Sequence, residues 1–261
     1  MTFEVVAQGF GLAEAPLWDR ESLLFSDAVF GGVKRVGRDG RVEEVLAKRR
    51  GIGGMALDAD GGLIVSGRDV LRIRPDGEQV ELLGRTPGFA GYNDMGTLAD
   101  GTLIVGELRF NPMQGETPQP SAIVALRPGD DHPDTTELPL VTWPNGIACA
   151  PDGETFYLAD FTTGEVWRDA HEAWARSPSE QADGLAVDAE GGVWVATGAG
   201  AAIARFVEGS LERTVEVPRA DFVSSLCFGG EGLEDAYVTV RQAVLRTRLG
   251  VAGLPVPRAR V

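Results

Sequence analysis

The feature of this sequence that most constrains its fold is a six-residue motif that returns six times. The motif begins at Glu14, Gly53, Asn93, Asn145, Asp183 and Ser224, so successive starts lie 39, 40, 52, 38 and 41 residues apart. A period near forty residues is typical of β-propellers and of solenoids, in which each repeat buries its apolar surface against its neighbours. The residues inside each repeat distinguish between these two architectures.

Each motif is followed by short apolar runs that alternate with turn signals. In the second repeat, Leu63–Gly67 follows the turn Asp60-Gly-Gly62, Val70–Ile73 comes next, and Arg74–Glu81 holds a further turn and a fourth run. Asp-Gly between apolar runs is a strong hairpin signal. The 3.6-residue period of helices is absent, and only Arg168–Arg176 could form a helical turn or two. Each repeat is therefore predicted to be four antiparallel strands.

Six such units predict an all-β fold, a six-bladed β-propeller that occupies residues 1–261 as a single domain. The run Phe3–Ala7 precedes the first motif. It is expected to form the outer strand of the last blade, which closes the ring and removes an open sheet edge. The 52-residue interval places one large insertion, Arg109 to Ser121, in the third blade. We expect this proline-containing loop to emerge at the channel mouth, as a lid or wall or as a solvent loop.

The first residues of the motifs carry a chemical pattern. All except Gly53 have a side-chain oxygen, and a propeller places equivalent positions around one axis at similar height. Glu14, Asn93, Asn145 and Asp183 should then share one small volume. Two carboxylates brought together without a counter-charge repel each other and raise a pKa, and a divalent cation resolves that conflict. One divalent cation is therefore expected, with Ca²⁺ favoured and Mg²⁺, Mn²⁺ or Zn²⁺ as alternatives.

Several segments carry a family resemblance when they are taken together. They are Leu12–Asp19, Tyr92–Asp94, Pro144–Gly153, Asp183–Ala196, and Cys227–Gly230 with Ala236–Thr239. With these segments the chain resembles the family of senescence marker protein, gluconolactonase and luciferin-regenerating enzyme. The resemblance implies a six-bladed propeller with one divalent metal in its channel. It also implies that Glu14, Asn145 and Asp183 are the metal ligands, that Asp183 is the general base, and that Asn93 contacts the substrate or a metal-bound water.

The chain departs from this family at one position. Many sugar lactonases of the family have arginine two residues before the asparagine of the third blade, where this chain has Gly91. That change removes a contact to a substrate hydroxyl or carboxylate. Arg109, at the base of the insertion, and Glu107 are the candidate substrate-binding residues that would replace it.

The function that follows is a metal-dependent hydrolase that opens a lactone with activated water. Two alternatives remain open. The same ligand set resembles that of diisopropylfluorophosphatase-like phosphotriesterases, and propellers also serve as non-catalytic small-molecule-binding modules. Several aromatic residues lie near the mouth by register and would favour a flatter, less polar substrate, although ordinary packing between blades is the simpler interpretation. They are Phe89, Tyr92, Phe110, Trp143 and Phe161.

Charge and composition exclude other partners. The formal net charge of −15 disfavours nucleic acid and anionic membranes, because both require clustered Lys and Arg. The segment Met1–Val6 lacks the basic and apolar regions of a signal peptide, and no apolar run is long enough to span a membrane. We therefore expect a cytoplasmic protein whose partner is a small-molecule substrate. The sequence gives no sign of the oligomeric state.

Overall fold

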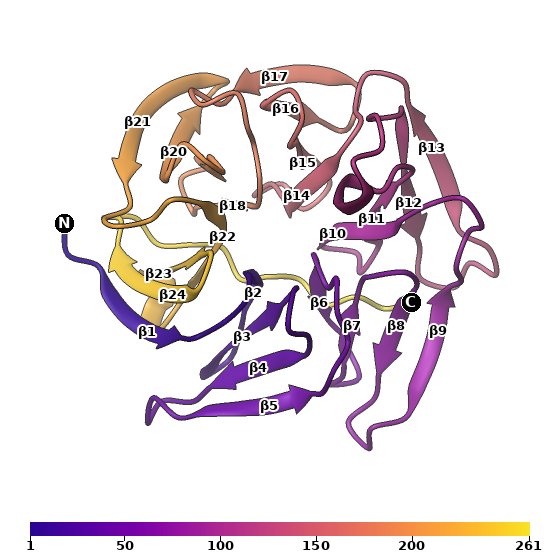
Figure 1. The fold of residues 1–261 in the computed structure, drawn as a ribbon, viewed down its shortest axis with the longest axis horizontal. Helices are drawn as coiled ribbons and strands as arrows, with labels where there is room; N and C mark the ends of the chain where they lie inside the picture. Colours follow the sequence, from indigo (N-terminus) through magenta and orange to yellow (C-terminus); the bar gives the residue numbers. More distant parts are fainter.

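A computed structural model describes all 261 residues of the chain. The chain forms six four-stranded antiparallel sheets, arranged as blades around a central channel (Figure 1). The predicted six-bladed β-propeller is confirmed. The second strand of each blade is buried almost throughout, as in β11 (Leu103–Leu108), whereas outer strands such as β5 (Val42–Leu46) are mostly exposed.

Five blades are continuous in sequence. The first holds β2 (Ala13–Asp19), β3 (Ser22–Asp27), β4 (Val33–Val36) and β5, and the second holds β6 (Met55–Leu57), β7 (Leu63–Val65), β8 (Val70–Ile73) and β9 (Gln79–Leu83). The third holds β10 (Gly91–Thr97), β11, β12 (Ser121–Leu126) and β13 (Asp134–Leu138), and the fourth holds β14 (Pro144–Cys149), β15 (Phe156–Asp160), β16 (Glu165–Arg168) and β17 (Glu172–Arg176). The fifth holds β18 (Leu185–Val187), β19 (Val193–Ala196), β20 (Ala202–Val207) and β21 (Ser210–Glu216).

The sixth blade joins the two ends of the chain. It consists of β22 (Val223–Gly229), β23 (Asp235–Val240) and β24 (Ala243–Arg248), with β1 (Glu4–Gln8) as the outer strand. Strand β1 pairs antiparallel with β24, and Figure 1 shows the two strands side by side. The predicted closure of the ring by the N-terminal strand is confirmed, and it gives the last blade the partner that its edge requires.

Glycine after the motif start lets adjacent inner strands approach each other closely. A Cβ atom on Gly146 would overlap the backbone of Gly184 and Leu185 in the next blade, and a Cβ on Gly184 would overlap Ser225. The backbone amide of Gly184 donates to the carbonyl of Ser224 over 2.8 Å. Small residues at this position therefore set the narrow inner radius of the ring.

The hydrophobic core lies between the blades rather than in one centre. One cluster combines Trp194 and Ile203 of the fifth blade with Leu226, Val238 and other residues of the sixth. Other clusters join neighbouring blades in the same manner. Each blade thus buries its faces against two neighbours, as the forty-residue repeat predicted.

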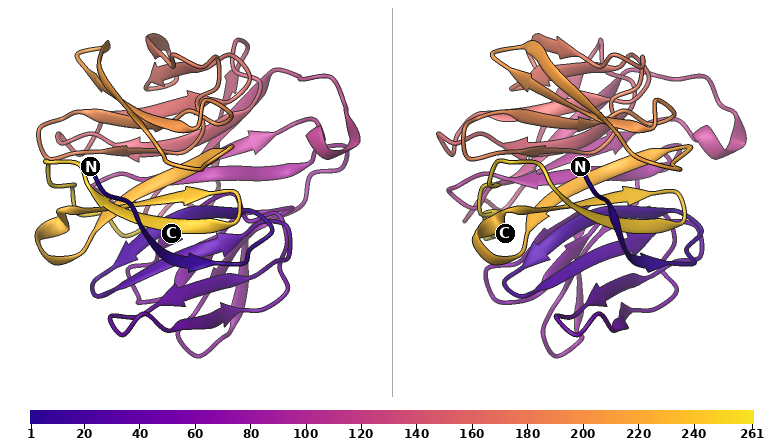
Figure 2. Two further views of the ribbon diagram at one scale, coloured as in Figure 1. Left: turned by 60° about the vertical axis from the view of Figure 1, so that its left-hand side comes forward. Right: turned by 90° about the vertical axis from the view of Figure 1, so that its left-hand side faces the viewer.

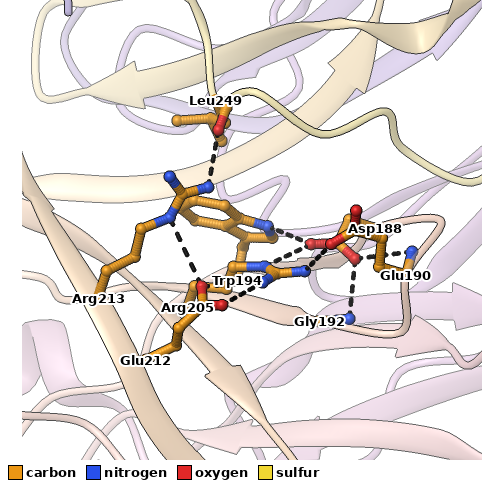
Figure 3. A network of polar contacts seen from close by, with 8 residues as sticks. All are labelled: Asp188, Glu190, Gly192, Trp194, Arg205, Glu212, Arg213 and Leu249. Atoms are coloured by element: carbon orange, nitrogen blue, oxygen red, sulfur yellow. Dashed lines mark hydrogen bonds and ion pairs between the residues drawn. The ribbon is translucent and has the colours of Figure 1, made fainter.

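A buried ion-pair network ties together the strands of the fifth blade (Figure 3). The guanidinium of Arg205 contacts Asp188 at 2.7 Å, Glu212 at 2.8 Å and Glu190 at 3.0 Å, and the Trp194 indole N–H donates to Asp188 at 2.8 Å. Burial alone would raise the pKa of Asp188, but the hydrogen bonds from Arg205 and Trp194 outweigh it and lower that pKa. The network is structural and lies outside the channel.

The stretch Arg168–Arg176, for which a helical turn was considered, is instead the β16–β17 hairpin. Asp169 and Ala170 both have positive φ, 50° and 59°, and His171 donates its backbone N–H to the Arg168 carbonyl. Two successive residues with positive φ form the tight turn that suits antiparallel strands. The only helical elements are two short 3₁₀ turns, η1 (Pro112–Gln114) and η2 (Glu231–Leu233). The chain has no helix with the length and hydropathy needed to cross a membrane.

The insertion and the C-terminal tail lie on opposite faces of the disc (Figure 2). We call the face that carries the insertion and the motif starts the upper face. The tail, residues 250–261, crosses the lower face beneath the channel (Figure 1). It closes a small cavity of about 110 Å³ in the lower channel, which Leu254, Pro255 and Pro257 line together with Met95 and Leu226 of the inner strands.

Candidate active site at the upper mouth of the channel

The inner strands are irregular where they reach the upper mouth. Pairing shifts register between Glu14 and Leu17 in β2, between Tyr92 and Met95 in β10, between Pro144 and Ile147 in β14, and between Val223 and Ser225 in β22. A β-bulge turns side chains out of the regular alternation and is frequent beside active sites. The bulges thus free the polar residues at the motif starts from the sheet faces.

Hydrogen bonds connect the motif starts around the ring. The amide of Gly146, which follows Asn145, donates to the Asp183 carbonyl at 3.2 Å. Ser224 receives the bond from Gly184 described above, and its hydroxyl donates to the Ala13 carbonyl at 2.7 Å. Asn145, Asp183, Ser224 and the strand that carries Glu14 therefore follow one another around the mouth, as the register predicted.

Three acidic side chains interact electrostatically in this volume. Desolvation by burial, and then the charge of Asp94, raise the pKa of Glu14 from 4.5 to about 8. Desolvation raises the pKa of Asp94 from 3.8 to about 7. The pKa of Asp183 is raised well above 3.8, first by desolvation and then by the charges of Glu14 and Asp94. No cationic side chain contributes to any of these shifts, so the acids repel one another without a counter-charge.

Asn145 supplies an amide to the same group. Asn145 is 8% exposed, and its side chain partly offsets the rise in the pKa of Asp183, which is 3% exposed. Carboxylate and amide oxygens without a neighbouring cation are the donor set that a hard divalent cation prefers. The chain contains no group of three His, Cys, Asp or Glu side chains arranged to hold a metal ion, so a cation here would require the Asn145 oxygen. Glu14, Asn145 and Asp183 fit a divalent cation by charge and by donor type.

The Asn93 side chain contacts both neighbouring blades, the second and the fourth. Its Nδ2 donates to the Pro144 carbonyl at 2.9 Å, and its Oδ1 occupies the space that a Cβ on Gly53 would need. This contact explains why the second motif begins with glycine. Asn93 is half-buried at the mouth. Its predicted contact with substrate stays a prediction.

The other two predicted substrate residues are tied to each other. Arg109 contacts Glu107 at 2.8 Å and forms a two-pronged ion pair with Glu137 at 2.5 and 2.7 Å. Its guanidinium also lies 5.2 Å from the centre of the Phe89 ring. Glu107 is 6% exposed. The structure thus engages both side chains in protein contacts at the base of the insertion.

Gly91 cannot carry the arginine found in many sugar lactonases of the resembled family. Its φ is +135°, and a Cβ there would overlap the Gly67 carbonyl oxygen and lie 2.7 Å from Arg68 Cα. The Tyr92 amide donates to the same Gly67 carbonyl at 2.7 Å, which fixes this close approach. The backbone of this chain therefore excludes any side chain at position 91.

Asp94 is the acidic residue that the sequence reasoning missed. It follows Asn93 directly, and residues that alternate along a regular strand cannot both face the channel. The register shift between Tyr92 and Met95 breaks that alternation. The signal in the sequence was the pair Asn93-Asp94 at a motif start, because the second residue of this pair also carries side-chain oxygens.

The chain is similar in sequence and in fold to several known proteins. Residues 12–242 match the sequence model of a protein family, the SMP-30/gluconolactonase/LRE-like region. A regucalcin of Xenopus laevis is 26% identical over 90% of this chain and 85% of its own length, and a pentonolactonase of Haloferax volcanii is 26% identical over 90% and 83%. The crystal structure of regucalcin, a calcium-binding protein, from Agrobacterium tumefaciens superposes with a TM-score of 0.82 at 21% identity, over 98% of this chain and 97% of that one.

Proposed function

Because the chain belongs to the SMP-30/gluconolactonase/LRE-like family, we propose that it is a hydrolase that opens a lactone with the help of one divalent cation. The similarity to a pentonolactonase supports the reaction class. The observation that carries the proposal is that Glu14, Asp94 and Asp183 interact through their charges at the mouth, with no cationic side chain to offset them. Such a group is unfavourable in an inert scaffold and suits a bound cation.

Glu14, Asn145 and Asp183 would hold the cation, with Ca²⁺ favoured by the all-oxygen donors. Mg²⁺, Mn²⁺ and Zn²⁺ are alternatives for the same donors. The cation would keep the acids ionised, polarise the lactone carbonyl and stabilise negative charge on its oxygen.

The side chains supply the remaining chemistry. Asp183 accepts a proton from a water molecule as the water oxygen bonds to the acyl carbon. The ring C–O bond then breaks, and the proton returns from Asp183 to the departing ring oxygen. Asn93, at the mouth, orients the substrate through its amide.

The test is proton release from glucono-1,5-lactone and δ-valerolactone, measured before and after chelation with EDTA. We expect turnover that EDTA abolishes and that Ca²⁺ or another divalent cation restores. Asp183→Asn should lower kcat by about 10²–10⁴-fold. The matched control is Asp221→Asn, an exposed acid on the same face that pairs with Arg241 at 3.2 Å, and it should leave kcat unchanged.

Other outcomes identify the alternatives. Hydrolysis of diisopropyl fluorophosphate with no lactone turnover would assign the site to phosphotriester chemistry. Cation binding without hydrolysis of either class would make the protein a binding module. Lactone turnover of equal rate in wild type and Asp183→Asn would contradict the proposed mechanism.

A further inference from the structure

Four aromatic rings from three blades form a continuous row at the upper mouth, which we call the aromatic arc. Phe110 lies in the insertion, Trp143 immediately precedes β14, Phe161 immediately follows β15, and Phe222 immediately precedes β22. Successive ring centres are 5.5 Å, 4.7 Å and 6.2 Å apart. The arc therefore spans from the third blade to the sixth.

The arc runs beside the candidate active site. Trp143 is two residues before Asn145, and Phe222 is two residues before Ser224. The backbone amide of Gly146 donates to the Asp183 carbonyl, and that of Gly184 donates to the Ser224 carbonyl. The inner strands of the fourth, fifth and sixth blades are therefore neighbours at the mouth. The arc thus borders the part of the mouth where Asn145 and Asp183 lie.

A groove of about 650 Å³ opens along this arc. Trp143, Phe161, prolines of the insertion and the buried Phe110 form its apolar wall. Thr162, Ser179 and Gln181 add uncharged polar lining, and Phe222 lies beyond the groove. Its charged lining residues, Glu116 and Glu180, are both acidic, and no Lys, Arg or His lines it. An apolar wall with acidic neighbours accepts a neutral flat group and disfavours an anion.

The opposite side of the mouth lacks the polar contacts that a sugar requires. Gly91 cannot carry a side chain, and the Arg109 guanidinium is engaged by Glu137 and Glu107. One N–H of the Asn93 amide donates to the Pro144 carbonyl. Few groups on this side of the mouth are therefore free to bond to several sugar hydroxyls, whereas the half-buried rings of Trp143 and Phe161 present apolar surface to the groove.

We propose that the substrate is a lactone with a flat, apolar substituent, such as an aryl ring, which packs against the aromatic arc, rather than a polyhydroxylated sugar lactone. This inference rests on the proposed lactonase function and names its substrate class. The substituent lies in the groove, and the lactone carbonyl is directed toward Asn145 and Asp183. The carboxylate formed by ring opening is repelled by Glu116 and Glu180, which favours product release.

The experiment compares three six-membered lactones with an alkoxide leaving group: δ-phenyl-δ-valerolactone, δ-valerolactone and glucono-1,5-lactone. We expect kcat/KM to be highest for the phenyl compound, by about tenfold or more over δ-valerolactone. Phe161→Leu, which keeps an apolar side chain, should lower the ratio of kcat/KM for the phenyl compound to kcat/KM for δ-valerolactone from about tenfold to near one. The control Phe30→Ala removes a ring that is 64% exposed on the first blade and should leave all three rates unchanged.

Binding separates this inference from the proposed function. The lactam analogue of the phenyl lactone resists hydrolysis, and its binding is followed by tryptophan fluorescence in wild type and Phe161→Leu. Binding that the variant weakens about tenfold, without turnover of any lactone, would support the groove and overturn the lactonase proposal. Turnover that favours glucono-1,5-lactone, or that Phe161→Leu leaves unchanged, would overturn the inference while the lactonase proposal stands.

Discussion

At the scale of single residues, Glu14 and Asp94 make the stability of the protein depend on pH. Their pKa values rise from 4.5 to about 8 and from 3.8 to about 7 on folding. For each acid, between its unfolded and its folded pKa, the folded protein binds more protons than the unfolded chain. The free energy of unfolding therefore falls as pH rises through this interval. Without divalent cations, we expect the melting temperature to fall between pH 5 and pH 8 for this reason. Saturating Ca²⁺ should flatten the dependence, and a cation-free melting temperature that rises over this interval would contradict the charge assignment.

Asp183→Asn should change stability in opposite directions with and without a cation. At pH 8 and in EDTA, the variant removes one of three mutually repelling charges, so it should melt a few degrees above wild type. In Ca²⁺ at 100 times its Kd, wild type should gain about 2.7 kcal/mol and the variant little. Differential scanning fluorimetry of both proteins, with Asp221→Asn as the matched control, checks the predicted reversal. The same order of melting temperatures in both buffers would exclude a cation role for Asp183.

Some residues of the candidate site could be predicted from the sequence, and others could not. The repeat register correctly placed Glu14, Asn145 and Asp183 around one mouth because equivalent positions of a propeller share height and radius. It missed Asp94 because the bulge in β10 breaks the two-residue alternation that assigns side chains to faces. Likewise, the overlap between the Asn93 Oδ1 atom and the position of a Cβ on Gly53 depends on a side-chain contact between two blades, which no local pattern encodes.

At the scale of the element, the fifth blade depends on the buried network around Arg205. The Arg205 side chain is the sole cationic partner of Asp188, which is fully buried beside the Trp194 indole. Arg205→Ala would leave that carboxylate without its counter-charge and should destabilise the protein by about 3–5 kcal/mol. Urea denaturation measures the loss. The control Arg127→Ala breaks an exposed pair with Asp134 and should change the free energy of unfolding by less than about 1 kcal/mol. Equal losses of unfolding free energy in the two variants would contradict the claim that burial makes the Arg205–Asp188 pair important for stability.

Most elements were predictable because Asp-Gly and Gly-Gly turns separate the apolar runs. One exception is the β16–β17 hairpin, which has Asp169 and Ala170 at its turn rather than a glycine. Alanine rarely adopts positive φ, so the sequence carried no turn signal there. The hairpin forms because β16 pairs with β15, and tertiary pairing then overrides local preference.

At the scale of the whole molecule, the C-terminal tail acts as a strap across the lower face. Backbone bonds join Ala252 to Ala189 at 2.8 Å, Ala259 to Leu57 at 2.8 Å and Arg260 to Gly101 at 3.0 Å, and Arg258 pairs with Asp19 at 2.7 Å. The Gly253 amide also donates to the Leu233 carbonyl of the sixth blade at 2.9 Å, so the strap contacts five blades. Closure of the ring by β1 was predictable from the repeat, but the strap was not, because residues 250–261 show no strand periodicity and their contacts are all tertiary.

Removal of residues 250–261 should loosen the ring and open the lower channel. The loss of several hydrogen bonds, each worth about 1 kcal/mol, should lower the melting temperature by on the order of 10 °C. Circular dichroism melting of the truncated chain measures this change. Substitution of Arg258 by alanine removes one ion pair only and should have a much smaller effect. A truncated protein with the same melting temperature as wild type would show that the pairing of β1 with β24 is sufficient to hold the ring closed.

The most direct test of the account is calorimetric titration of Ca²⁺ into cation-free protein at pH 8. The account predicts one ion per chain in wild type, with proton release because Glu14 and Asp183 bind the ion in their ionised forms. Asp183→Asn and Asn145→Leu should each abolish or greatly weaken this binding, whereas Asp221→Asn should retain it. Absence of binding of Ca²⁺, Mg²⁺, Mn²⁺ and Zn²⁺ to wild type, or unchanged binding in Asp183→Asn, would contradict the convergence of these groups on a single cation.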